Sequence, residues 1–367
     1  MGITLNKPTG IEDVNDRLQR ILSIHLDPSG GSLYWLERQR ALGLDLQREI
    51  RSVRDLHLLG PMDEQALAQR PIEDFVPRSL HHTRSAWVTS QTAGTLGAPK
   101  HAVHRQDEFE AAFVTPFTQA AAMVAFPREA NWLFVGPSGP HIIGKAARAC
   151  AAAMGSADPF TLDLDPRWAK KLPRGSFAWE RYVAHIQEQA MTILDSQRIG
   201  VLFSTPVVLE NLGLAMSAAQ REAILGLHLG GISVSASQRT LFVQMFPRAV
   251  ILSGYGNSLF GVMPELAWSA QTGFDYFPHS TRLILRVIPL DAGPRHELRE
   301  DAPSGERGQV VVTRLDELQM IVNMIERDSA ILIRPPESSA TAGFVLNGLR
   351  EPQPIMNQVM RPTTGLY

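Results

Sequence analysis

Residues 11–80 alternate charged positions with leucine and isoleucine at helical spacing, as in Asp45–Ile50. Apolar residues that recur every three or four positions line one face of a helix, so this pattern predicts a helical N-terminal region. Pro71 and Pro77, with the polar run that follows them, break the pattern. We therefore expect a new unit to begin near residue 81.

The middle of the chain alternates between two kinds of apolar pattern. Short apolar runs predict strands at 85–89, 131–135, 198–204 and 249–253. Runs with helical spacing predict helices at 107–126, 144–154, 177–195, 217–227 and 238–246. The helix after Arg105 opens with a capping-box spacing, Asp107-Glu108-Phe109-Glu110. This alternation predicts a layered α/β domain with a largely parallel sheet.

The pattern changes after about residue 265. Short strands are expected at 281–287, 308–313 and 330–333, between turns rich in Pro, Gly and Asp. The segment 335–367 is rich in Pro, Gly, Ser and Thr, and we expect it to be loosely ordered. The expected organisation is a helical region packed on the core (1–80), an α/β core (81–265), a β-rich subdomain (266–335) and a C-terminal tail (336–367).

Composition and charge narrow the class of partner. The 367 residues are 44% hydrophobic and 20% charged, which is ordinary for a globular protein. The formal net charge of -2 gives no basic footprint for nucleic acid or an anionic membrane, so a small-molecule partner is favoured. Cys150 is the single cysteine, so no intramolecular disulfide is possible. With no secretory signal at the N-terminus and an apolar run at 111–126 too short to span a bilayer, we expect a cytoplasmic protein.

The most informative segment is 92–100, Thr-Ala-Gly-Thr-Leu-Gly-Ala-Pro-Lys, directly after an expected strand. Its glycines allow close backbone approach, while hydroxyls, successive amides and one lysine can surround phosphate oxygens. This combination predicts a phosphate-binding loop, although a Gly/Thr surface turn is the alternative. The segment lacks the GxxxxGK[ST] spacing of mononucleotide loops, and no GxGxxG follows a strand.

Segment 92–100 resembles the phosphate-binding signature of the adenylate-forming superfamily, which includes acyl-CoA ligases and the adenylation domains of peptide synthetases. Six of the eight specified positions match; Ala93 and Leu96 depart, and each loses a hydroxyl. The segment 101–104 resembles the second strand of that family's phosphate-loop hairpin. The resemblance implies catalytic roles for Lys100 and Thr95, and ATP contacts from Thr92, Ala93, Gly94, Thr95, Gly97 and Lys100.

Three later segments follow in the family's order. Gly139–Gly144 resembles the acid-pocket motif, Gly230–Ser233 resembles the segment over adenine, and Ser253–Ser258 resembles the G-Y-G-x-[ST]-E element. A helix-capping or core role for His141, and a glycine turn with a packed Tyr255, remain alternatives. The resemblance implies ATP contacts from Gly231, Ile232, Ser233, Tyr255, Gly256, Asn257 and Ser258. It implies an acid pocket of His141, Gly144, Gly254, Gly256 and Phe260.

Two further landmarks follow. Gly305–Val312 resembles a family turn and strand, and Asp328 stands where the family has an aspartate that binds the ribose hydroxyls. Glu326 and Arg327 replace the family's Thr and Gly, so a surface role for Asp328 is the alternative.

Leu259 and the C-terminal segment depart from the family in ways that affect chemistry. Leu259 replaces a glutamate that helps hold the Mg²⁺ of MgATP, and an apolar side chain cannot ligate that ion. Losing such a stabiliser costs about 3 kcal/mol, so adenylation would be slowed; Glu265 could compensate. The family's mobile C-terminal domain carries a catalytic lysine, whereas residues 329–367 contain none. We therefore expect only adenylate formation, with transfer completed by an acceptor or carrier protein.

The resemblance covers residues 85–333 and is closest to the phenylacetate-CoA-ligase-like branch. Among short members the chain looks most like truncated adenylating proteins of phenazine-antibiotic biosynthesis, which act on an aromatic acid such as griseoluteic acid. LuxE-type acyl-protein synthetases are a second relative. The implied fold is the large N-terminal domain of adenylate-forming enzymes, an α/β class with a small β-rich subdomain and the mobile C-terminal domain largely missing. The implied cofactors are ATP and Mg²⁺.

Other classes of function have less support. A non-catalytic protein that binds the acid and nucleotide would also fit Leu259 and the missing lysine. A serine hydrolase is disfavoured because Ser138 lacks the G-x-S-x-G spacing. His81, His82, His101 and His104 have no carboxylate or cysteine at ligand spacing, so we expect solvated or strand-paired histidines and no protein metal site.

Overall fold

The computed structural model describes residues 11–94, 97–231, 233–290 and 298–355. The chain divides into two compact units that interleave along the sequence. Unit 1 comprises the described parts of 1–89, 100–112 and 274–355, and unit 2 comprises those of 90–99 and 113–273. The four segments expected from the sequence, and the boundaries between them, remain a prediction.

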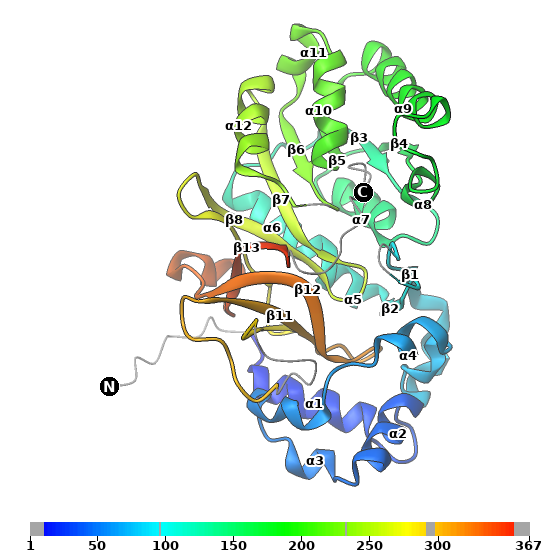
Figure 1. Cartoon of the computed structure of the whole chain (residues 1–367), viewed down its shortest axis with the longest axis vertical. Helices are drawn as coiled ribbons and strands as arrows, with labels where there is room; N and C mark the ends of the chain where they lie inside the picture. Colours follow the sequence, from blue (N-terminus) through cyan, green and yellow to red (C-terminus); the bar gives the residue numbers. More distant parts are fainter. Residues whose placement is uncertain (1–10, 95–96, 232, 291–297, 356–367) are drawn as a thin grey trace. The chain divides into compact units, whose positions relative to one another are not determined.

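Unit 1 begins with short helices, as the charged and aliphatic pattern predicts. They are α1 (Val14–His25), α2 (Leu33–Leu42), α3 (Leu46–Glu49), η1 (Val53–Leu59), α4 (Glu64–Gln69), η2 (Ile72–Asp74) and η3 (Arg78–Ala86), drawn in blue to cyan in Figure 1. Helix α1 starts where the Asp13 side chain accepts from the Asn15 amide at 2.8 Å. Its buried face is Leu18, Ile21, Leu22 and His25, the spacing of one helical face.

The β-rich part of unit 1 is an antiparallel array in the order β10-β11-β12-β13-β9. Its strands are β9 (Gly273–Tyr276), β10 (Leu283–Ile288), β11 (Arg307–Arg314), β12 (Ile321–Ile333) and β13 (Gly348–Pro354), with η5 (Glu337–Ala342) before the last. The expected strand at 330–333 is only the end of β12. The loose order expected for 335–367 is wrong over β13, which pairs with β12 and β9. Residues 356–367 lie outside the described part.

After the N-terminal helices, the strands β1 (Trp87–Gln91) and β2 (His101–Arg105) form a two-stranded sheet. The capping box expected at Asp107–Glu110 does not lie where the helix begins. Helix α5 (Gln106–Phe109) starts directly after Arg105, and the Glu108 carboxylate accepts from the Arg105 amide at 2.9 Å, so the box forms two residues before the predicted position. The same carboxylate accepts from the Leu318 amide at 2.9 Å. Glu108 therefore joins α5 to a turn more than two hundred residues later in unit 1.

A buried ion cluster lies beside that turn. Asp316 bonds to the guanidinium groups of Arg282 and Arg314, and the exposures of the Asp316 and Arg314 side chains are 2% and 0%. Burial alone would raise the pKa of Asp316, but the two guanidinium groups outweigh burial and lower it. Because the charges compensate one another, they can remain ionised inside the unit.

Unit 2 contains a six-stranded array in the order β8-β7-β6-β5-β3-β4. Its strands are β3 (Asn131–Gly136), β4 (Phe160–Asp163), β5 (Ile199–Ser204), β6 (Gly226–Leu229), β7 (Val250–Asn257) and β8 (Gly261–Ser269). The pairs from β4 to β7 are parallel, whereas β7 and β8 form an antiparallel hairpin. The predicted layered α/β fold with a largely parallel sheet is confirmed.

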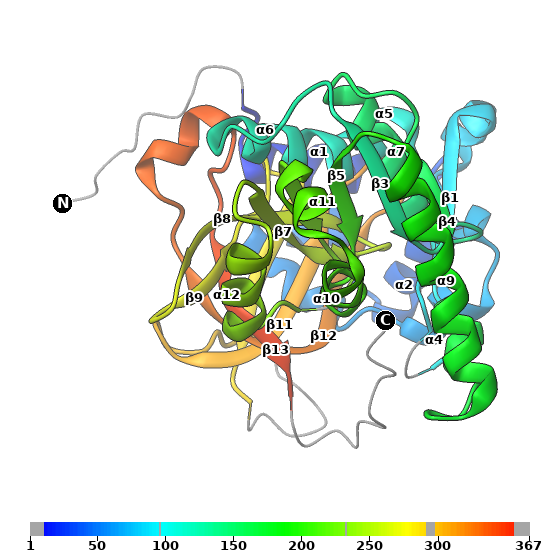
Figure 2. The same ribbon diagram turned by 90° about the horizontal axis from the view of Figure 1, so that it is seen from above.

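Helices cover both faces of this sheet. They are α6 (Thr115–Met123), α7 (Ile142–Ala153), α8 (Pro166–Ala169), α9 (Phe177–Ser196), α10 (Pro206–Ala215), α11 (Ala218–Ala223) and α12 (Ala236–Met245). In Figure 2, α6 lies on one side of β5 and β7, and α10 and α12 lie on the other. All six residues of β5 are buried, as expected for a strand covered on both faces.

The helix predicted at 217–227 is partly wrong. It ends at Ala223, and β6 begins at Gly226. The helix predicted at 107–126 is α5, a π-helical turn η4 (Glu110–Val114) and α6. Within the described ranges, no helix combines the length and apolar character needed to cross a membrane.

Candidate functional site

A cavity of about 160 Å³ lies within unit 2, where parallel strands β5, β6 and β7 end. Ligands of open α/β sheets bind at this carboxyl edge. The cavity is lined by Thr92, Ala93, Phe113, Pro137, His141, Ile142, Ile143, Phe203, His228, Leu229, Gly230, Gly231, Gly254, Gly256, Asn257, Ser258, Gly261 and Val262.

Many residues predicted from sequence surround this one cavity. They come from four separate segments of the chain: Thr92, Ala93, His141, Gly231, Gly254, Gly256, Asn257 and Ser258. The predicted ATP-binding and acid-pocket positions thus meet in unit 2. The parallel sheet brings them together, because β6 and β7 are neighbours and both end at this edge.

One part of the cavity lining is apolar and aromatic. Phe203 on β5 and His228 on β6 are register partners, and their ring centroids are 4.1 Å apart. Phe117 of α6 packs on the His228 ring at 4.6 Å. Phe113, Ile142 and Val262 complete this wall. Such a lining favours a flat, apolar ligand group.

The polar part of the lining, where Thr92 meets the β7–β8 turn, is held by hydrogen bonds and is called the mouth of the cavity below. Ser258 Oγ donates to the Gln91 carbonyl at 3.1 Å, and the Asn257 side chain accepts from the Leu259 amide at 2.8 Å. Arg167 donates to the Gln91 side chain at 3.0 Å and to the Thr92 carbonyl at 3.2 Å. The Ser258 bond ties Gln91, the residue before segment 92–100, to the β7–β8 turn, and the Arg167 bonds tie the same place to α8.

The start of α7 also borders the cavity through His141, Ile142 and Ile143. The first amides of a helix carry partial positive charge, which favours a carboxylate or phosphate nearby. His141 occupies the N-cap position without a side-chain capping bond and is 8% exposed. Burial lowers the pKa of His141, and Arg167 lowers it further, so the ring is neutral at pH 7.

Two glycines explain how backbone reaches the mouth. Gly94 has φ of +62°, and a Cβ there would lie 2.8 Å from Pro99 Cγ. A Cβ on Gly256 would lie 2.0 Å from the Gly261 carbonyl oxygen across the β7–β8 hairpin. Glycine is therefore the residue that permits both conformations.

The other predicted residues lie elsewhere. Five of them are described but do not line the cavity. Gly97 and Ser233 are exposed, and Gly144 is in the first turn of α7. Tyr255 is half-buried on β7, and Phe260 is 2% exposed. Thr95 and Ile232 lie outside the described residues. Lys100 and Asp328 belong to unit 1. There the Lys100 ammonium pairs with Glu64 at 2.6 Å, and Asp328 on β12 faces Pro354 in the register.

The residues near the β7–β8 turn do not fit a protein-held Mg²⁺. Leu259 is 1% exposed and apolar. Glu265, the sequence-based substitute, is 6% exposed and accepts from Ser253 Oγ at 2.7 Å while pairing with Arg239 at 3.3 Å. Its carboxylate is thus occupied by protein donors. Across the described ranges, no cluster of three His, Cys, Asp or Glu residues could hold a metal.

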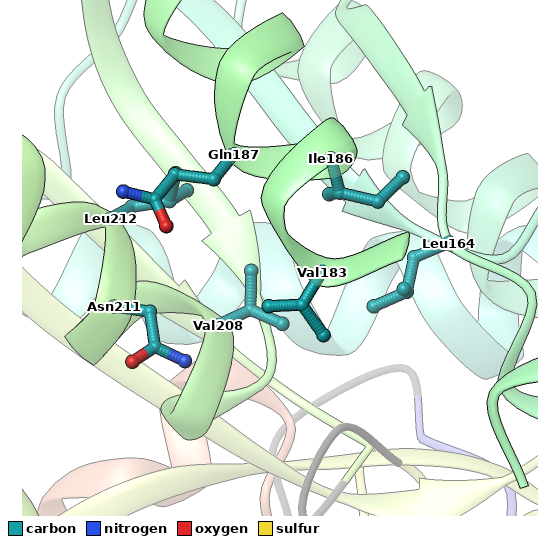
Figure 3. A pocket seen from close by; sticks show the side chains of 7 residues that line it. All are labelled: Leu164, Val183, Ile186, Gln187, Val208, Asn211 and Leu212. Atoms are coloured by element: carbon teal, nitrogen blue, oxygen red, sulfur yellow. The ribbon is translucent and has the colours of Figure 1, made fainter. Parts of the chain in front are cut away.

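Two other hollows of unit 2 lie away from this edge. Figure 3 shows one between α9, α10 and the residue after β4, lined by Leu164, Val183, Ile186, Gln187, Val208, Asn211 and Leu212. It encloses about 20 Å³, room for roughly one water. The second is a groove of about 620 Å³ at the amino ends of β3 and β5, where Asn131 and Ile199 are among the lining residues. Its open form and its position opposite the carboxyl edge make it a weaker site than the 160 Å³ cavity.

Sequence reasoning missed the aromatic wall. Phe113, Phe203 and His228 were not predicted, and His228 was missed because β6 was not foreseen. The available signal was the run Gly226–Leu229, four residues bounded by Gly230 and Gly231. Four residues are short for a strand, and the preceding helical pattern hid them.

The chain was compared with known proteins. No protein-family model matches the sequence, and no curated protein matches it. Among solved structures, the chain is similar to 2-hydroxyisobutyryl-CoA ligase in an open conformation with 2-HIB-AMP and CoA. The TM-score is 0.64 at 13% identity, over 92% of this chain and 67% of that one. The same ligase in the thioesterification state gives 0.61 at 16% identity, over 93% and 66%.

A weaker similarity, with a TM-score of 0.42 at 14% identity, is found to ATP-bound MatB from Rhodopseudomonas palustris, over 66% of this chain and 45% of that one. The likeness to the 2-hydroxyisobutyryl-CoA ligase confirms the predicted fold, that of the N-terminal domain of adenylate-forming enzymes. The chain spans about two thirds of the length of that ligase.

Proposed function

We propose that the chain uses ATP to activate a carboxylic acid as an acyl-adenylate and releases pyrophosphate. The observation that carries the proposal is the cavity at the carboxyl edge of β5 to β7, around which four predicted segments converge. The proposal also draws support from the fold, which is shared with a ligase whose structure contains an acyl-AMP, 2-HIB-AMP.

In the proposed reaction, a carboxylate oxygen of the acid attacks the α-phosphorus of ATP. An oxygen–phosphorus bond forms, the bond to the bridging oxygen breaks, and pyrophosphate leaves with that electron pair. The chain's contribution is to position the two reactants and to neutralise charge. The neutral His141 ring and the start of α7 would orient the acid, and Thr92 and Ser258 would face the phosphates.

Lys100 and Thr95 are proposed to stabilise the leaving pyrophosphate, as the resemblance implies. Magnesium would arrive with ATP, held by phosphate oxygens and water, and no step is assigned to it because Leu259 and Glu265 do not offer ligands.

We further propose an aromatic acid, of a phenazine type such as griseoluteic acid, used in antibiotic biosynthesis. The aromatic wall supports the aromatic part of the proposal. A cavity of about 150 Å³ holds benzene, so the 160 Å³ found here suits one ring, with the remaining rings of a phenazine extending through the mouth. Transfer of the acyl group would need an acceptor or carrier protein, and a cytoplasmic location is proposed from the single cysteine.

Acid-dependent exchange of labelled pyrophosphate into ATP tests the function. Lys100→Ala is expected to lower the exchange rate roughly 10²-fold, since removing one charge-stabilising donor has that effect in other sites. Lys171→Ala, at an exposed lysine, is the matched control and should leave the rate unchanged. An unchanged rate in Lys100→Ala would remove the role assigned to that lysine.

A second candidate is a protein that binds the acid without turnover, favoured by the buried Leu259 and the occupied Glu265. Acid binding with no exchange in the wild-type chain would select it. A LuxE-like acyl-protein synthetase would instead show exchange followed by acylation of protein.

A further inference from the structure

The aromatic wall of the cavity includes a buried polar side chain, His228. His228 is 7% exposed and lies between Phe117 and Phe203, with centroids at 4.6 and 4.1 Å. Neither neighbour can form a conventional hydrogen bond. A buried polar group in such a wall needs a hydrogen-bond partner, and any partner it lacks in the protein can come from a ligand.

The hydrogen bond that His228 makes fixes its protonation. Nδ1 lies 3.2 Å from the Leu252 carbonyl oxygen, which can only accept, so Nδ1 carries a proton. Burial lowers the pKa of His228 to about 4, so the ring is neutral at pH 7 and has one proton. Nε2 is therefore a hydrogen-bond acceptor with a lone pair.

Nε2 is available to a ligand. Among the described residues, His228 makes its hydrogen bond through Nδ1, and none is made by Nε2. His228 lines the 160 Å³ cavity and is 7% exposed, so a ligand in the cavity can approach its ring. A ligand with a hydroxyl or N–H at this point would donate to it, whereas an ether or carbonyl oxygen would face another lone pair.

The sheet register places this acceptor away from the polar mouth. His228 comes two residues before Gly230 on β6, about 7 Å along the strand from the glycine-rich edge. Its register partner on β7 is Leu252, which likewise comes two residues before a glycine, Gly254. An acid whose carboxylate lies at the mouth thus presents its far end to His228.

We propose that His228 selects an aromatic acid that carries a hydrogen-bond donor, a hydroxyl or ring N–H, on the part of the ring remote from the carboxylate. This inference rests on the proposed function, because it assumes that the cavity is the acid site. It assigns to His228 a specificity role that neither the family resemblance nor the motif residues supply.

The first test keeps the wild-type chain and changes the acid. Phenylacetate, 4-hydroxyphenylacetate, 2-hydroxyphenylacetate and 4-methoxyphenylacetate are titrated by calorimetry, with the matching set built on benzoate and on 2-naphthoate. The 4-hydroxy acid, or the 6-hydroxy acid for naphthoate, is expected to bind about tenfold more tightly than the plain acid, a difference of about 1.4 kcal/mol. The 2-hydroxy and methoxy acids should show no such gain. Equal binding within every set, or binding of no aromatic acid, would overturn the proposal.

The second test changes the residue. His228→Phe keeps a ring of similar size without the acceptor, so the hydroxylated and the plain acid are expected to bind this variant with about equal affinity. Phe113→Leu, which alters the same wall without a polar group, should weaken both acids about equally. A tenfold preference that survives in His228→Phe would refute the role of His228. If His228→Phe does not fold, the comparison of hydroxy and methoxy acids in the wild type still decides.

Pyrophosphate exchange, measured with the same acids, separates the two proposals. A hydroxyl preference in binding with no exchange for any acid would uphold the role of His228 and reject adenylation. Exchange that is equal for hydroxylated and plain acids, with equal binding, would uphold adenylation and reject the role of His228.

Discussion

Glu265 can be tested as a structural residue beside the cavity of unit 2. Its carboxylate accepts from Ser253 Oγ at 2.7 Å and from the Ser253 amide at 3.2 Å, and it pairs with Arg239 at 3.3 Å. The side chains of Arg239 and Glu265 are 14% and 6% exposed. Ser253 directly precedes the Gly254–Ser258 segment that borders the cavity. We predict that Glu265 is a structural group rather than a magnesium ligand.

The expected loss of unfolding free energy in Glu265→Ala follows from the burial of the ion pair. Glu265→Ala removes the carboxylate opposite a largely buried guanidinium, and breaking a buried pair costs about 3–5 kcal/mol. Arg239 also donates to the Ile251 carbonyl at 3.1 Å and lies 5.6 Å from the Trp268 ring, which stabilise the cation. We therefore expect the lower end, about 3 kcal/mol. Glu265→Gln keeps one acceptor for Ser253 and should cost about 1.5 kcal/mol.

The assay is urea unfolding of the whole chain, with pyrophosphate exchange measured on the same samples under folding conditions. Replacing both partners, as in Arg239→Met with Glu265→Leu, should restore most of the stability lost in Glu265→Ala, because no buried charge is left unpaired. The reasoning fails if Glu265→Gln leaves stability unchanged and lowers exchange 10²-fold. That result would assign the carboxylate to the metal.

Two further predictions concern stability. Gly256→Ala should destabilise the chain by about 3 kcal/mol in urea unfolding, since its Cβ would lie 2.0 Å from the Gly261 carbonyl oxygen. Gly230→Ala, whose Cβ would be 3.5 Å from Phe203, should cost under about 1 kcal/mol, and equal midpoints for the two variants would contradict the close approach. Burial lowers the pKa of both His25 and His228 to about 4, so unfolding takes up protons below about pH 6.5. As the pH is lowered from about 6.5 to 4, the free energy of unfolding should fall by about 1.4 kcal/mol per pH unit for each histidine. His228→Phe should halve this histidine contribution to the slope between about pH 6.5 and 5. An unaltered slope would show that His228 is not held neutral.

The sequence predicted those features that local pattern determines. The α1 face of Leu18, Ile21 and Leu22 repeats at helical spacing, so it was predictable. The start of a helix after Arg105 was also predictable from local residues, although its capping box forms two residues before the predicted position. The glycine and hydroxyl positions around the cavity mouth were found because they lie in short contiguous motifs. Backbone geometry imposes these residue types wherever the chain folds this way.

Features that depend on distant partners were not predictable. The β6 strand is four residues long, and its stability comes from β5 and β7, so the helical pattern before it dominated the interpretation. With β6 hidden, His228 could not be placed beside Phe203. Strand β13 was likewise concealed by a Pro-rich composition, because its pairing with β12 and β9 is set by tertiary structure. Local propensity is a weak guide where pairing decides.

The interleaving of the two units limits how the chain can be dissected. A fragment expressed from Phe113 to Gly273 would retain β3 to β8 and the aromatic wall, yet it would lack Gln91, whose carbonyl accepts from Ser258 at 3.1 Å. Thr92 and Ala93 would be lost with it, so the excised piece would present a truncated mouth. Ligand studies on such a fragment would report on the inner wall alone. An engineered minimal version needs residues 90–99 spliced back, for example through a designed linker ahead of Phe113.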